Sequence, residues 1–113
     1  MPLNFIADQE IFLLDNSGQR QRVLMRISMP VERTDEHGRL LWDCAPRLDG
    51  LVDIKKSVSS FSSLGAVILA TASLRRLIRD FARGKRIFLG SPSRPGEPDP
   101  EGEVTLKELF ELH

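Results

Sequence analysis

The sequence predicts an α+β fold: an antiparallel sheet of three to five strands, one long helix packed across a face of it, and a short C-terminal helix. Two patterns carry this prediction. Apart from Leu24, residues 22–29 alternate between polar and apolar side chains, as in a half-buried strand. Residues 62–83 carry apolar side chains three or four positions apart, as in a long amphipathic helix. The candidate strands precede that helix one after another, which is typical of an antiparallel sheet covered by a helix.

The first two strands are expected to form a hairpin. Residues 10–14 are apolar and β-prone, and residues 15–18 are of the types that favour turns. Residues 22–29 form the clearest strand, which Pro30 ends because proline cannot donate to a ladder. The side chains expected on the buried face of that strand are Val23, Met25, Ile27 and Met29.

A polar connection and a third strand follow. Residues 32–39 are charged or polar and are predicted to be an exposed connection. Residues 40–45 are predicted to be a strand, and Pro46 marks either its end or an edge position. Residues 51–56 leave open a short extra strand. The side chains expected to share a buried face of the third strand are Leu40, Trp42 and Cys44.

The long helix has both a start and a stop signal. Ser62 or Ser63 is the candidate N-cap, and Gly84 is placed to terminate the helix. Residues 86–90 then read as a buried strand that returns to the sheet, with Phe88 in the core. The apolar positions at helical spacing are Leu64, Val67, Ala70, Leu74, Leu77, Ile78 and Phe81.

The chain of 113 residues fits one domain followed by a tail. We expect a single α+β domain over residues 1–90. Residues 91–103 hold four of the seven prolines together with glycine and acids, and are predicted to be a flexible loop. Residues 104–113 are predicted to be a short amphipathic helix, opened by a capping box of Thr105 and Glu108.

The net charge is zero, but its distribution is uneven. Residues 1–74 carry a net charge of −1, residues 75–94 carry +6, and residues 95–113 carry −5. Four arginines near the end of the long helix are the candidate partner-binding residues: Arg75, Arg76, Arg79 and Arg83. They could complement the helix dipole, be neutralised by the acidic tail, or receive an acidic partner, because arginine binds carboxylates and phosphates bidentately.

The sequence lacks the residue patterns that metal sites and catalytic sites require. Only His37, His113 and Cys44 could supply nitrogen or sulfur ligands, and their spacing fits no zinc site. Cys44 is expected to be a small buried hydrophobe rather than a nucleophile, and a carboxylate cluster of Asp43, Asp49 and Asp53 is explained more simply by turns. We therefore expect no catalytic, metal or cofactor site.

Targeting signals are also missing from the sequence. The first ten residues lack the basic and apolar regions of a signal peptide. The longest apolar stretch, residues 64–72, is far shorter than the roughly 20 residues of a membrane-spanning helix. A single cysteine also fits a reducing compartment. We expect a soluble, cytoplasmic protein with no membrane partner.

Three segments carry a recognisable pattern: residues 41–51, with a Trp-x-Cys strand followed by Leu and Gly, the alanine-rich run 62–70, and residues 88–90. This pattern resembles that of a family of small bacterial domains of unknown function. The match covers roughly residues 10 to 90 and carries no catalytic signature. By analogy, the resemblance implies a toxin-neutralising or regulatory binding protein.

The function expected from these observations is that of a non-enzymatic binding domain with a protein partner of unknown identity. The alternative is a nucleic-acid-binding protein that uses the arginine-rich end of the helix, although no exposed aromatic residues are expected between the arginines. A third hypothesis is a small-molecule or weak enzymatic role in a pocket between helix and sheet. A homodimer through a sheet edge is compatible with all three hypotheses.

Overall fold

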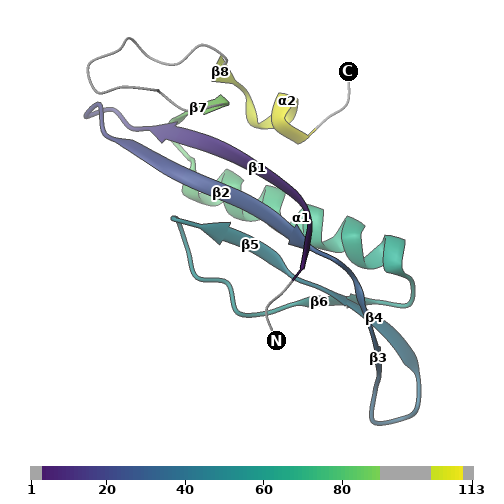
Figure 1. Cartoon of the computed structure of the whole chain (residues 1–113). Coiled ribbons are helices and arrows are strands. Elements are labelled where there is room, and N and C mark those ends of the chain that lie inside the picture. The colour runs from purple at the N-terminus through teal and green to yellow at the C-terminus, as the bar shows by residue number, and fades with distance from the viewer. Residues whose placement is uncertain (1–3, 90–102, 111–113) are drawn as a thin grey trace.

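The computed structural model describes residues 4–89 and 103–110, and it shows antiparallel sheets covered by one long helix (Figure 1). This confirms the α+β class, but the described strands form two sheets rather than one. The five-stranded sheet has the order β5-β2-β1-β7-β8, and the three-stranded sheet has the order β3-β4-β6. The elements are β1 (Phe5–Leu14), β2 (Arg20–Ser28), β3 (Val31–Thr34), β4 (Leu40–Cys44), β5 (Pro46–Asp49), β6 (Val58–Ser60), α1 (Ser63–Phe81), β7 (Arg86–Leu89), β8 (Glu103–Val104) and α2 (Leu106–Phe110).

The hairpin of β1 and β2 is confirmed, although β1 begins at Phe5 rather than at residue 10. Its turn is held by the Asp15 carboxylate, which accepts hydrogen bonds from the amides of Ser17 and Gln19 at 2.9 Å. Gly18 lies in the left-handed region, at a φ of 85°. The side chains of the turn therefore set the register of the longest strand pair in the fold.

The expected buried face of β2 is only partly correct. Val23 and Met25 are buried, but Met29 is 50% exposed and Ser28 is buried instead. A bulge in β1 shifts the register here, because Phe5 pairs with Ser28 while Ala7 pairs with Ile27. A bulge bends and twists a strand, and at this point the chain leaves the five-stranded sheet for the second one.

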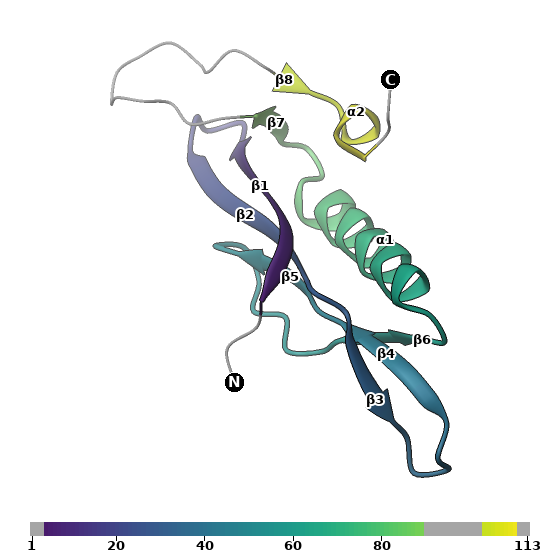
Figure 2. The ribbon, with the colours of Figure 1, turned by 45° about the vertical axis from the view of Figure 1, so that its right-hand side comes forward.

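The segment predicted to be a polar connection, residues 32–39, largely belongs to a second hairpin. β3 pairs with β4, and the turn between them includes Gly38 at a φ of 78°. Every residue of β3 is exposed, so the strand shows no buried alternation that the sequence could reveal. The hairpin of β3 and β4 projects beyond the N-terminal end of α1 (Figure 2), and the molecule measures 56 × 30 × 21 Å.

The predicted third strand ends before Pro46, one of the two alternatives, because β4 ends at Cys44. Pro46 then begins β5, an edge strand of the five-stranded sheet that the sequence did not predict. The short extra strand that the sequence left as an alternative at residues 51–56 does not form. Val52 makes only an isolated bridge to Leu48, and the next strand is β6 at Val58–Ser60.

Helix α1 begins and ends where its capping residues predict. The Gly65 amide donates to the Ser62 hydroxyl at 2.9 Å, which makes Ser62 the N-cap. Gly84, at a φ of 77°, follows the C-terminal turn. The expected apolar face was wrong in part: Leu64 is 69% exposed and Phe81 41% exposed. The buried row of α1 consists of Ala66, Ala70, Leu74 and Ile78.

The core lies between α1 and the sheets as two clusters. The larger one lies against the five-stranded sheet, and the smaller one joins Cys44 to Ala66 and Ala70, with Trp42 half-buried against it. Phe88 is buried, as expected. The buried members of the larger cluster are Ile11, Leu13, Val23, Met25, Leu48, Leu74, Ile78, Ala82 and Ile87.

The chain after β7 is described only from residue 103 to residue 110. The loop expected at 91–103 lies outside the described residues apart from Glu103, which pairs with Phe88 as part of β8. The capping box is confirmed: the Thr105 hydroxyl accepts from the Glu108 amide at 3.1 Å, and the Glu108 carboxylate accepts from the Thr105 amide at 3.2 Å.

Candidate functional site

The arginines singled out in the sequence lie on the solvent side of α1 and at its C-terminal end. Arg75, Arg76 and Arg79 belong to α1, and Arg83 follows the C-cap Ala82. All four are exposed. The buried row of α1 repeats every four residues, so at 100° per residue the three helical arginines point away from the sheets. The structure thus places them together on an open surface.

These arginines differ from the others in the described chain by what they contact. Arg75, Arg76 and Arg83 make no hydrogen bond or ion pair in this part of the structure, and Arg79 only approaches its neighbour Asp80, at 3.7 Å. Elsewhere, arginines bind carboxylates or main-chain carbonyls. Those engaged arginines are Arg22, Arg26, Arg33, Arg39, Arg47 and Arg86.

The same side of α1 is apolar toward its N-terminus. Leu64 is 69% exposed, Ile68 58% and Leu69 46%, and Ala72 is exposed as well. We call this solvent side the outer face of α1; its apolar half consists of Leu64, Ile68, Leu69 and Ala72, and its basic half of Arg75, Arg76, Arg79 and Arg83. Sequence reasoning missed the apolar half, because it assigned Leu64 to the core. The signal was present in the two adjacent apolar residues 68 and 69, which cannot both face the sheet with the row 66, 70, 74 and 78.

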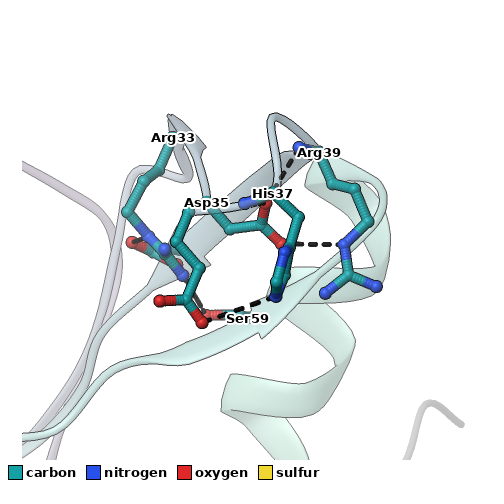
Figure 3. Close-up of polar contacts among 7 residues, drawn as sticks. Arg33, Asp35, His37, Arg39 and Ser59 are labelled. Carbon is teal, nitrogen blue, oxygen red and sulfur yellow. Dashed lines mark hydrogen bonds and ion pairs between the residues drawn. The ribbon is translucent and has the colours of Figure 1, made fainter.

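The hairpin of β3 and β4 is the second prominent surface, and its arginines and aspartates are paired with one another (Figure 3). Arg33 donates to the Asp43 carboxylate at 2.7 and 3.2 Å, and the Ser59 hydroxyl donates to the same carboxylate at 2.6 Å. These donors hold the pKa of Asp43 below its usual value. The network joins all three strands of the smaller sheet.

The turn of this hairpin is closed in the same way (Figure 3). The Asp35 carboxylate accepts from the amides of His37 and Arg39 and from the Arg39 guanidinium, at 2.8 to 2.9 Å. The main-chain donor of Arg39, followed by its side chain, lowers the pKa of Asp35. Both arginines of the hairpin are thus bound to aspartates, and its acids without an arginine partner are Glu32 and Glu36, of which Glu36 approaches His37 at 3.5 Å. The hairpin therefore has no free cationic group comparable to Arg75, Arg76 and Arg83 on the outer face of α1.

The residues weighed for catalysis do not all come together in the described residues: Asp49 and Asp53 line one surface pocket, and Asp43 is not part of it. Asp43 is bound to Arg33, and the Asp49 carboxylate is 3.1 Å from Arg26. Cys44 is buried, and its burial raises the pKa of the thiol, which disfavours the reactive thiolate. No group of three or more His, Cys, Asp or Glu side chains in residues 4–89 and 103–110 could hold a metal ion.

A pocket of about 260 Å³ lies between α1, α2 and the β1–β2 hairpin. Most of its lining is apolar, and its volume falls below the roughly 300 Å³ at which ligand pockets begin. The apolar lining consists of Met25, Ile27, Leu74, Leu89, Leu109 and Phe110, together with Ala7. Separately, none of the described helices combines the length and apolar character that crossing a bilayer requires.

Comparison of the chain with protein-family models, with curated proteins and with solved structures gives no match. The resemblance to small bacterial domains of unknown function therefore stays a prediction.

Proposed function

We propose that this protein is a non-enzymatic binding module, cytoplasmic and regulatory or toxin-neutralising in role, whose outer face of α1 receives an acidic surface of a protein partner. The observation that carries the proposal is the contrast among the arginines. Those on the hairpins and sheets are engaged with acids or carbonyls, whereas Arg75, Arg76 and Arg83 have no polar partner in the described residues.

The spacing of these arginines is unfavourable in the free protein. Arg75 and Arg79 are four residues apart and Arg76 and Arg79 three, so their charges are neighbours on the helix surface. Like charges at such spacings destabilise a helix by about 0.2–0.5 kcal/mol per pair. The helix dipole offsets part of this cost near the C-terminus. Carboxylates of a partner would remove the repulsion and form bidentate bonds with the guanidinium groups.

Nucleic acid is the second candidate partner, and one observation favours it. Phe81 is 41% exposed and lies in sequence between Arg79 and Arg83, where it could stack on a base. The apolar half of the outer face favours a protein instead, because interfaces with nucleic acid are more polar and are dominated by phosphate contacts.

Affinity capture from extract of the source cells tests the proposal. The tagged wild-type protein is compared with the double variant Arg76→Glu/Arg79→Glu, with and without nuclease. A control with the same change of charge is Lys55→Glu/Lys56→Glu, since both lysines are exposed and Lys55 only approaches Asp53, at 3.8 Å.

The proposal expects a protein that is captured after nuclease treatment by the wild type and by the lysine control, and lost with the arginine variant. If only nucleic acid is recovered, and if the amount recovered falls with the arginine variant and with rising salt concentration, the face would be assigned to nucleic acid. Equal capture by all three proteins would contradict both assignments. Matching far-UV circular dichroism spectra establish that the variants are folded.

A further inference from the structure

We infer that the outer face of α1 docks an amphipathic helix of the partner, which runs antiparallel to α1 and carries acidic residues in its first half and apolar residues in its second. This inference rests on the proposed function and specifies the partner's chemistry. It is carried by the order of side chains along α1, apolar and then basic, rather than by the arginines alone.

The apolar half of the outer face indicates that the partner has apolar side chains where it contacts this half. Leu64, Ile68 and Leu69 are each about half exposed or more, on the helix that also supplies the core. Leu64 and Ile68 are four residues apart, so they form a continuous ridge on the helix surface. Large apolar side chains grouped beside charged ones are typical of interaction sites. A purely acidic partner surface would leave this ridge in water.

The helix dipoles determine the direction of the partner helix. The C-terminal end of α1 carries the basic half and the negative end of its own dipole. Acidic residues stabilise a helix when they lie in its first turns, and the N-terminal end is the positive end of a helix dipole. A partner helix whose acidic N-terminal half lies beside Arg75 and Arg79 pairs its acids with these arginines and also places them at the positive end of its own dipole. This arrangement is antiparallel to α1.

The outer face also has the length of a helical docking site. From Leu64 to Arg79 there are fifteen residue steps, or about 22 Å at 1.5 Å per residue. A partner helix of about four to five turns covers this length, and such amphipathic helices bind apolar surfaces through residues at i, i+3, i+4 and i+7.

A second copy of this chain fits the face less well. If α1 paired with itself in a parallel arrangement, the basic halves would oppose each other. Full antiparallel overlap would place the arginines of one copy on Leu64 and Ile68 of the other. Charge complementarity therefore favours an acidic partner over self-association.

Three synthetic peptides of one composition and about 18 residues test the inference by fluorescence anisotropy. The first has glutamates in its N-terminal half and leucines at helical spacing in its C-terminal half. The second has these blocks in reverse order, and the third has a scrambled order. We expect the acid-first peptide to bind about fivefold or more tightly than either of the others, which corresponds to about 1 kcal/mol.

Two protein variants show which half of the face is used. Ile68→Asp should weaken binding of the acid-first peptide tenfold or so, about the effect of losing one buried apolar contact. Val31→Asp is the matched control, because Val31 is equally apolar and 57% exposed on β3, away from α1; it should leave binding unchanged. The double variant Arg76→Glu/Arg79→Glu should abolish binding of the acid-first peptide.

Each contrary result has a defined meaning. Equal binding of the three peptides overturns the inference. Loss of binding with Arg76→Glu/Arg79→Glu but not with Ile68→Asp also overturns it, while leaving the proposed function intact. Two further results would assign the face to another occupant and overturn both: binding to phosphatidylglycerol vesicles that Ile68→Asp abolishes, or a dimer in analytical ultracentrifugation that the same variant dissociates.

Discussion

Gly65, in the first turn of α1, lies against the Ser60 side chain of β6 so closely that a β-carbon at position 65 would collide with the Ser60 hydroxyl. The same β-carbon would lie 2.9 Å from the Ser62 hydroxyl, which caps the helix, and 3.2 Å from the Ser60 β-carbon. This contact sets the distance between α1 and the smaller sheet. It therefore helps to define which side of α1 remains exposed.

Gly65→Ala should consequently destabilise the protein by about 1 kcal/mol, whereas the same change at an exposed helical position gains about that amount. Ser60→Ala removes the hydroxyl with which the added β-carbon at position 65 would collide. This second change should therefore restore part of the lost stability. Thermal unfolding of both single variants and the double variant measures this coupling. Additive effects would show that the two residues do not collide.

Gly50 tests a close approach between two main-chain segments. It has a φ of 92°, and a β-carbon there would lie 2.5 Å from the main-chain carbonyl oxygen of Arg22. Gly50→Ala should cost more than the roughly 1–2 kcal/mol of a left-handed alanine, because the main chain of β2 cannot move aside as a side chain can. Gly38→Ala is the control, since Gly38 has a φ of 78° and open space around it. If urea denaturation gave equal losses of stability for Gly50→Ala and Gly38→Ala, this explanation would be contradicted.

The N-cap of α1 can be assigned by a pair of alanine substitutions. Ser62→Ala should lower the free energy of unfolding by about 1 kcal/mol, because the hydrogen bond to the Gly65 amide is lost. Ser63→Ala should have little effect, since Ser63 is the first residue of α1 and its side chain is exposed. An equal loss in both variants, measured by urea denaturation, would argue against Ser62 as the cap.

The network in the smaller sheet should make stability depend on pH. Arg33 first, and then Ser59, hold the pKa of Asp43 below its ordinary value of 3.8. A carboxylate whose pKa is lower in the folded state stabilises the fold above the unfolded value. That contribution is lost as the pH falls from 3.8 through the folded value.

Asp43→Asn should therefore lower the free energy of unfolding at neutral pH and flatten its decline below pH 3.8. The stabilities of the wild type and the variant should converge in acid. Asp53→Asn serves as the control, because Asp53 is exposed and only approaches Lys55. A constant difference between wild type and Asp43→Asn at every pH would contradict the assignment.

The parts of the fold that local chemistry determines could be predicted from the sequence. Both ends of α1 follow from Ser62 and Gly84, and the capping box of α2 follows from Thr105 and Glu108. The strands that were missed lack such signals. β3 is exposed on every residue, and β6 and β8 have three and two residues, too few to show a period.

The candidate site was predictable only in part. The exposure of the arginines followed from charge and position, but periodicity cannot tell which of two apolar rows of α1 faces the sheet. The structure selects the row with Ala66 and Ala70, whose small side chains pack beside Cys44. Leucine and isoleucine on the neighbouring rows, at 64 and 68, are left on the outer face.

Site-specific photo-crosslinking in the source cells tests the central claim most directly. A photoreactive amino acid in place of Ala72 lies at the end of the apolar half of the outer face, next to the basic half, and leaves every arginine intact. We expect a discrete protein adduct from this position, and none from a matched position at Thr34, which is exposed on β3. An adduct from Thr34 alone, or none from Ala72, would show that the outer face of α1 is not where the partner binds.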